Sequence, residues 1–233
     1  MTSFLLNSNG LILYKNEHLE RIKRSVTWCF QKEIELDLEE IVKKYRSDYD
    51  QKIKLIFFLL EGKIVYKVIH QPFSKLEINS FRVIVKSENN QIPNYIKRDD
   101  YGFALQQKRF HQLSRYEDFL WVSKDQKCQN TTFGNILFYD EESGFSSPRI
   151  DEGALLGISI QKFQDFARLE NFAFSFKDIS LESTKRMDGV FMINSVSGLI
   201  PIFEVKEVGS YRSQKVFEQY EKKWLEFLNT NFR

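Results

Sequence analysis

Apolar residues recur every three or four positions near the start of the chain. Leu19, Ile22, Val26 and Cys29 follow this spacing, and charged residues occupy the opposite positions. The pattern predicts an amphipathic helix. Asn16 is the residue expected to open it, because an asparagine side chain can accept a hydrogen bond from the first free amides of a helix.

The period changes to two after residue 50. Residues 52–60 and 63–70 flank the turn formers Glu61-Gly62, so they predict a β-hairpin. A second helix is expected before the hairpin, over residues 36–46, and a further strand after it, over residues 78–86. Together these elements predict a small α+β unit in the first part of the chain.

A polar segment follows over residues 87–95 and contains Pro93, which suits a connection between subdomains. We therefore expect a small N-terminal subdomain over residues 1–98 and a larger C-terminal subdomain over residues 99–233. The expected fold class is α+β, with two subdomains and mixed sheets. The later elements are predicted as a helix ending near Tyr116, strands near 119–123, 134–139, 171–178, 190–193 and 199–205, and helices near 159–169, 180–187 and from residue 213 onward.

Composition narrows the class of protein. The chain has 233 residues, of which 42% are hydrophobic, and its 22 phenylalanines can fill a sizeable core. Its 34 basic and 32 acidic residues nearly cancel, so we expect neither a nucleic-acid nor a membrane partner. The two cysteines, Cys29 and Cys128, form neither a disulfide framework nor a metal-site spacing, and no apolar run is long enough to span a bilayer. A soluble cytoplasmic protein without a bound metal is expected.

The residues alone give weak indications of a site. His18, His70 and His111 are widely spaced, and we interpret each as a structural or surface residue. Two loops have the chemistry of anion cradles, because small polar residues there leave backbone amides free. One is residues 157–159 before a predicted helix, and the other is residues 194–198 between predicted strands. Plain turns are the alternative interpretation of both loops.

Five segments stand in order along the chain: HLERIKRS (18–25), IKRDD (96–100), NTTFGNILF (130–138), SPRIDEGALLGIS (147–159) and MDGVFMINSVSGLIPI (187–202). In this order they resemble the class IV aminotransferase and aminodeoxychorismate lyase family. That family depends on pyridoxal 5'-phosphate (PLP) and has the fold of D-amino-acid and branched-chain aminotransferases. The chain is similar to a short bacterial variant that begins near the family's Glu-Thr/Ser motif, and the similarity extends through residues 71–85.

The resemblance implies a set of cofactor-binding residues. Lys97 matches the lysine that holds PLP covalently and then moves the proton at the substrate α-carbon, which makes it the predicted catalytic residue. Arg21 matches the arginine that binds the cofactor phosphate, a task that suits a guanidinium. The amide of Ile158 and the hydroxyls of Ser159 and Ser195 match the rest of the phosphate site.

The resemblance also implies a substrate site and a ring contact. Val196 and Ser197 match the segment whose backbone amides approach the substrate carboxylate. Asn130 stands where the family has an acidic residue against the pyridine nitrogen, and an amide there stabilises a protonated ring less than a carboxylate does. Ile160 replaces an arginine, and residues 154–157 lack the family's proline.

Three functions follow from these observations. The first is a PLP enzyme that acts on a small amino compound, either as an aminotransferase of the branched-chain or D-amino-acid type or as an aminodeoxychorismate lyase that forms 4-aminobenzoate. The second is a degenerate relative that binds PLP with little or no catalysis, which Asn130 and Ile160 suggest. The third is a binding module whose basic residues near Lys108, Arg109 and Arg115 contact an anionic partner. The family resemblance also implies a homodimer.

Overall fold

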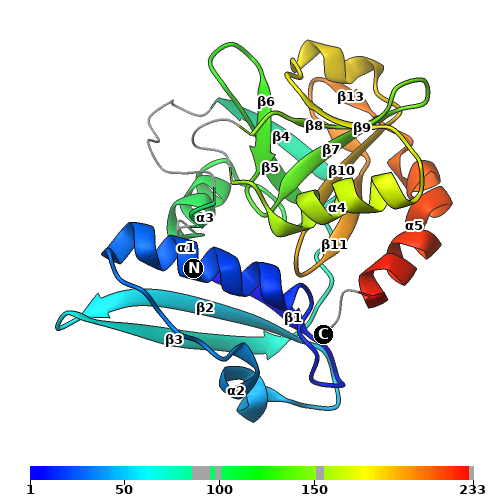
Figure 1. Cartoon of the computed structure of the whole chain (residues 1–233). Coiled ribbons are helices and arrows are strands. Elements are labelled where there is room, and N and C mark those ends of the chain that lie inside the picture. Colours follow the sequence, from blue (N-terminus) through cyan, green and yellow to red (C-terminus); the bar gives the residue numbers. More distant parts are fainter. Residues whose placement is uncertain (86–94, 98–100, 151–154, 231–233) are drawn as a thin grey trace.

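The chain folds around three β-sheets, as Figure 1 shows for the computed structural model. The structure describes residues 1–85, 95–97, 101–150 and 155–230. The predicted division at residue 98 and the residues that follow Lys97 in its motif, 98–100, lie outside this description. The division into residues 1–98 and 99–233 therefore stays a prediction.

The first sheet has three antiparallel strands in the order β1-β2-β3. Its long hairpin joins Leu60 to Lys63 through the turn at Glu61-Gly62, as predicted. Gly62 has a φ of +74°, a conformation that glycine adopts without a steric cost. The elements of this part are β1 (Thr2–Leu6), α1 (Lys15–Phe30), α2 (Leu38–Val42), the 3-10 helix η1 (Lys43–Tyr45), β2 (Gln51–Leu60) and β3 (Lys63–Pro72).

Strand β1 is buried on both faces. Phe4 and Leu6 pack into a cluster with α1, α2 and β2, whereas Leu5 turns to the other side and packs against Tyr14 and Ile158. Successive side chains of a strand point to opposite faces, so one short strand serves two cores. This explains why the apolar run at the start of the chain folds as a strand, which the sequence pattern did not predict.

Two five-stranded mixed sheets form the rest of the molecule, with the orders β11-β10-β7-β8-β9 and β13-β12-β4-β5-β6. Pairing is parallel between β8 and β9, and β4 lies parallel to both β5 and β12. The elements are β4 (Ser80–Val85), α3 (Tyr101–Phe110), β5 (Glu117–Val122), β6 (Cys128–Thr131), β7 (Asn135–Asp140), β8 (Gly144–Pro148), α4 (Ile158–Leu169), β9 (Phe174–Lys177), η2 (Glu182–Arg186), β10 (Gly189–Asn194), β11 (Gly198–Ile202), β12 (Glu204–Val205), β13 (Gly209–Ser210) and α5 (Ser213–Thr230).

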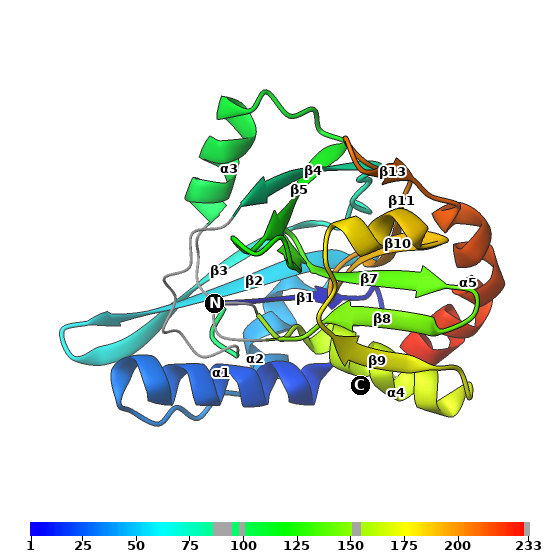
Figure 2. The same cartoon turned by 90° about the horizontal axis from the view of Figure 1, so that it is seen from above.

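The period-two pattern of β7 and β10 assigns their side chains to two different cores. One face turns toward the sheet that contains β4 and β5. On this face, Ile136, Phe138 and Met192 pack with Phe81 of β4 and Leu120 of β5. On the opposite face, alternate residues of the same strands meet helices α4 and α5, whose aromatic side chains fill the outer core. Figure 2 shows these two helices along one side of the sheet. The arrangement is a layered α+β fold, as the sequence predicted.

Most predicted helices and strands are confirmed, with some differences at their ends. Helix α1 begins at Lys15 and its N-cap is Tyr14 rather than Asn16. Helix α3 ends at Phe110, before the predicted Tyr116. Strand β4 pairs with β5 and β12 of the later chain, not with the preceding hairpin. Among the described residues, no helix is both long enough and apolar enough to cross a membrane.

Candidate active site

A buried polar group joins α1 to β1. Arg21 Nη2 donates to Thr2 Oγ1 at 2.7 Å, and the same oxygen lies 2.7 Å from His18 Nδ1. His18 is fully buried and Arg21 is only 8% exposed. They are three residues apart on α1, so both side chains project from the same helix face. The predicted cofactor residue Arg21 therefore points into the protein and not into solvent.

Lys97 lies beside this group. Its carbonyl oxygen accepts a hydrogen bond from the Met1 amino group at 2.9 Å, which brings its segment to the start of β1. Burial lowers the pKa of His18 well below its ordinary value, and the positive charges of Arg21 and Lys97 lower it further. The structure thus brings Lys97 and Arg21, predicted from distant segments, to the same histidine.

Lys97 also lines a cavity of about 170 Å³ between α1 and β2. Most of the other lining side chains are apolar, among them Ile22, Val26 and Phe57. The Lys97 side chain is half-buried. None of the other predicted cofactor residues, which are Arg21, Asn130, Ile158, Ser159 and Ser195, lines this cavity.

The second part of the candidate site is the start of helix α4. Asn135, only 4% exposed, donates to the Leu155 carbonyl at 2.8 Å and accepts from the Gly157 amide at 3.1 Å. A Cβ atom at Gly157 would lie 2.2 Å from Asn135 Oδ1, so only glycine fits there. The amides that follow, at Ile158 and Ser159, begin a 12-residue helix whose N-cap residue provides no side-chain hydrogen bond.

Ser159 and Ser195 meet at this helix end. Their hydroxyl oxygens are 3.3 Å apart, although the residues come from α4 and from the loop after β10. This contact unites two of the predicted phosphate ligands. Two hydroxyls and the positive end of a helix dipole form the kind of surface that binds a phosphate.

The amides of Val196 and Ser197 have a different role from the predicted one in this structure. Both donate to Asn194 Oδ1, at 2.9 and 2.8 Å. An asparagine that caps its own loop in this way stabilises a tight turn. To contact a substrate carboxylate as predicted, these amides would have to donate to it in addition to Asn194 Oδ1 or in its place.

The two departures from the family pattern occupy distinct environments. Asn130 is half-buried in β6, whereas Ile160 is fully buried. Ile160 packs among the aromatic side chains of α4, α5 and their sheet. An arginine at position 160 would place an unpaired positive charge in that core at a high cost in hydration, so the isoleucine suits the position.

Asp118 is a buried acid that the sequence pattern did not single out. It is fully buried on β5, and burial raises the pKa of its carboxyl to about 6. The increase in pKa is opposed by the charge of Lys108 and by the nearby polar groups of Thr132, Phe119 and Phe133. No described group makes a hydrogen bond of good geometry to either carboxyl oxygen.

The basic residues near α3 are used in packing. Lys108 lies over the Phe133 ring at 5.0 Å, and Arg115 lies over the Tyr116 ring at 4.5 Å. His111 packs edge-on against Phe119. These contacts give Lys108, Arg115 and His111 a role in packing. They add no support for a binding module with an anionic partner.

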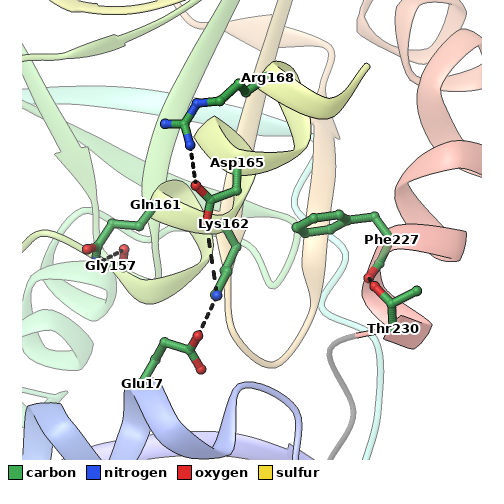
Figure 3. A network of polar contacts seen from close by, with 8 residues as sticks. All are labelled: Glu17, Gly157, Gln161, Lys162, Asp165, Arg168, Phe227 and Thr230. Carbon is green, nitrogen blue, oxygen red and sulfur yellow. Dashed lines mark hydrogen bonds and ion pairs between the residues drawn. The ribbon is translucent and has the colours of Figure 1, made fainter. Parts of the chain in front are cut away.

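Helices α1 and α4 are joined at their N-terminal ends (Figure 3). Lys162 of α4 forms ion pairs with Glu17 of α1 and with Asp165, and only 18% of the Lys162 side chain is exposed. Tyr14, just before α1, packs against Ile158. The N-terminal end of α4, which carries the predicted phosphate ligands Ile158 and Ser159, is therefore fixed to the helix that carries Arg21.

The residues present fit a phosphate-bearing cofactor. Arg21 Nε is buried and has no hydrogen-bond partner among the described residues. A buried guanidinium nitrogen without a partner is costly, and an anionic ligand would satisfy it. In the part of the chain that the structure describes, no group of three or more metal-binding side chains is found.

Comparisons with known proteins point to one family. Residues 1–205 match the profile of the family described as Amino-transferase class IV. A search of curated protein sequences finds no match.

Solved structures share the fold over nearly the whole chain. An aminotransferase from Brucella abortus bound to PLP has a TM-score of 0.79 at 16% identity, covering 97% of this chain and 88% of its own. The branched-chain aminotransferase of Thermoproteus uzoniensis with norvaline has a TM-score of 0.76 at 16% identity, covering 97% and 84%. A candidate 4-amino-4-deoxychorismate lyase from Legionella pneumophila has a TM-score of 0.76 at 16% identity, covering 99% and 90%.

The role of Asn135 can be tested by substitution. Asn135→Leu removes the hydrogen bonds to Leu155 and Gly157 and leaves their buried polar groups unpaired. We expect the free energy of unfolding to fall by about 1–3 kcal/mol, measured by urea denaturation. The exposed Asn16→Leu on α1 is the matched control and should change stability by less than about 0.5 kcal/mol. Equal effects of the two substitutions would contradict this role.

Proposed function

Because the chain belongs to the class IV aminotransferase family, we propose that it is a PLP-dependent enzyme of that family with Lys97 as its catalytic residue. The observation that carries the proposal is that Lys97 and Arg21 both lie against the start of β1. The Met1 amino group donates to the Lys97 carbonyl oxygen at 2.9 Å, and Arg21 Nη2 donates to Thr2 Oγ1 at 2.7 Å. These residues come from segments 76 positions apart, 97 minus 21, and both have the chemistry that the cofactor requires.

Each residue has a distinct task in the proposed site. Lys97 would hold the cofactor covalently through Nζ and would then move the proton at the substrate α-carbon. Arg21 would bind the phosphate with the amide of Ile158 and the hydroxyls of Ser159 and Ser195. Asn130 would hydrogen-bond the pyridine nitrogen, and the amides of Val196 and Ser197 would bind the substrate carboxylate. When bound, PLP supplies an electron sink for charge that develops at the substrate α-carbon.

The substrate is proposed to be a small amino compound, and two reactions fit the family. One is transfer of the amino group to a 2-oxo acid, as in a branched-chain or D-amino-acid aminotransferase. The other is the release of pyruvate from aminodeoxychorismate to give 4-aminobenzoate. The solved structures with this fold include proteins named for each reaction. A panel of amino acids with an oxo-acid acceptor tests the first reaction, and pyruvate release tests the second.

A homodimer in the cytoplasm is part of the proposal. The far half of the β2–β3 hairpin exposes a group of large apolar side chains, which favours burial against a second copy of the chain. Phe58 and Leu60 lie on one face of the hairpin, and Leu59 and Tyr66 lie on the other. The cysteines Cys29 and Cys128 are free thiols, which suits a reducing compartment.

The cofactor role of Lys97 is tested by absorbance. The purified protein with added PLP should show the visible band of a lysine-bound cofactor, and Lys97→Ala should abolish that band because no amine remains at this position. Lys124→Ala, in an exposed turn, is the matched control and should keep the band. A band of wild-type intensity in Lys97→Ala would exclude Lys97 as the attachment site.

The effect of Asn130 is tested by restoring an acid. Asn130→Asp should raise turnover with a productive amino substrate roughly tenfold, if the carboxylate stabilises the protonated ring by about 1.4 kcal/mol more than the amide does. Asn130→Ala should lower turnover, since it removes the hydrogen bond as well. Unchanged turnover in Asn130→Asp would show that position 130 does not face the ring nitrogen.

The homodimer is tested by sedimentation at several protein concentrations. The wild-type protein should sediment at twice its chain mass of 27.8 kDa. Leu60→Lys places a charge in the proposed interface and should weaken association roughly tenfold or more. Leu169→Lys is the control, because Leu169 is 68% exposed at the end of α4, outside the hairpin. A monomeric wild-type protein would contradict the proposal.

A further inference from the structure

Thr2, His18 and Arg21 form a connected polar group. Only Arg21 has a role in the function proposed above. Thr2 Oγ1 lies 2.7 Å from both Arg21 Nη2 and His18 Nδ1, and Arg21 Nη2 is 3.3 Å from His18 Nδ1. Thr2 and His18 are fully buried. The three side chains therefore contact one another in a closed triangle between β1 and α1.

The chemistry of the three groups fixes the tautomer of His18. A guanidinium has only donors, so the atoms that face Arg21 Nη2 must both be acceptors. Thr2 Oγ1 accepts from Arg21 and can give its own proton to His18 Nδ1. His18 Nδ1 is then unprotonated and its proton lies on Nε2. A proton on Nδ1 could still be donated to Thr2 Oγ1, but it would face the Arg21 cation. The Nε2 proton has no hydrogen-bond partner among the described residues.

Two cations act on the imidazole of His18. The charges of Arg21 and Lys97 both disfavour protonation of the imidazole, and burial does so more strongly, so the pKa of His18 is well below its ordinary value. Burial lowers the pKa of Arg21 to about 10, which leaves the guanidinium charged at neutral pH. A neutral imidazole can therefore accept from Arg21 without adding a third positive charge.

The triangle restrains only part of the guanidinium. Nη2 is occupied by Thr2 and His18, whereas Nε is buried and has no partner among the described residues. A guanidinium held at one nitrogen presents its remaining donors in a fixed plane, which suits the oxygens of a phosphate or a carboxylate.

We propose that Thr2 and His18 are positioning residues that hold the Arg21 guanidinium in place for the phosphate of the cofactor. The inference rests on the proposed function and adds to it the two residues that orient the phosphate ligand. Neither residue needs to touch the cofactor. Their effect would be seen in the affinity for the phosphate group and not in the chemistry at Lys97.

The experiment compares PLP with pyridoxal, which has the same aldehyde and ring without the phosphate. Apparent dissociation constants for both are measured by titrating the visible band of the full-length protein. His18→Phe keeps a ring in the cavity but removes the acceptor, and Thr2→Val keeps the shape of the side chain but removes the hydroxyl. Each should weaken PLP binding roughly ten- to a hundredfold, the range for one hydrogen bond to a charged group, and leave pyridoxal binding unchanged.

Conservative variants and a control complete the test. Thr2→Ser keeps the hydroxyl, and His18→Asn can place its amide oxygen near the position of Nδ1, so both should recover most of the PLP affinity. His70→Phe is the matched control, because His70 is an exposed histidine of β3 that bonds to Gln51. It should leave both affinities unchanged. Urea unfolding of each apoprotein shows whether a variant has lost its fold.

Three results would overturn the inference, and the first is distinguishable from the other two because it removes the proposed function as well. If the wild-type protein forms no band with PLP, the proposed function fails and the inference falls with it. If wild-type protein binds PLP, but His18→Phe and Thr2→Val lower PLP and pyridoxal affinity by the same factor, the two residues stabilise the fold and do not position Arg21. Unchanged PLP affinity in both variants also overturns the inference alone.

Discussion

The charge of Arg21 inside the protein is the constraint on which the candidate site depends. Moving a guanidinium out of water costs several kcal/mol unless hydrogen bonds and an opposite charge replace the lost hydration. Thr2 and His18 supply the hydrogen bonds, but both are neutral, so the charge itself remains uncompensated by them. A bound phosphate is the natural counter-charge, and this links the energetics of the apoprotein to the chemistry of its ligand.

The same constraint explains why the start of the chain is so heavily buried. Thr2 can reach Arg21 only if β1 is held tightly against α1, and β1 is held because its apolar residues enter cores on both of its faces. One of these cores includes Ile158 at the start of α4. The ion pair between Glu17 of α1 and Lys162 of α4 also joins these two helices. The residues proposed to bind the phosphate, from α1 and from the start of α4, are thus positioned by the same packing contacts.

The sequence predicted local elements well, because amphipathic periodicity is a local property. The spacing of Leu19, Ile22 and Val26 predicted α1, and the alternation around Glu61-Gly62 predicted the hairpin. What could not be predicted depends on contacts between distant residues. The parallel pairing of β4 with β5 and β12, and the short strands β1, β6 and β8, have no distinctive pattern of their own.

The candidate site shows the same limit. Lys97 and Arg21 were identified only through ordered motifs, since neither differs from an ordinary surface residue in its sequence context. Ser159 and Ser195 also lay in loops whose small polar residues suggested anion cradles, with plain turns as the alternative. His18 was interpreted as structural because a lone histidine in a helix gives no sign of its partners, and its importance appears only when Thr2 comes within 2.7 Å of Nδ1.

The departures from the family pattern are best understood by position. Ile160 faces an aromatic core, so its loss of charge follows from packing and has no necessary effect on the cofactor. Asn130 is different, because it is half-buried in a strand and retains a polar side chain. An amide at this position can still orient a ring by a hydrogen bond, but it cannot share a positive charge. In the proposed site, Lys97 and the phosphate ligands keep the chemistry of the family pattern, and the contact with the ring nitrogen is the part that differs.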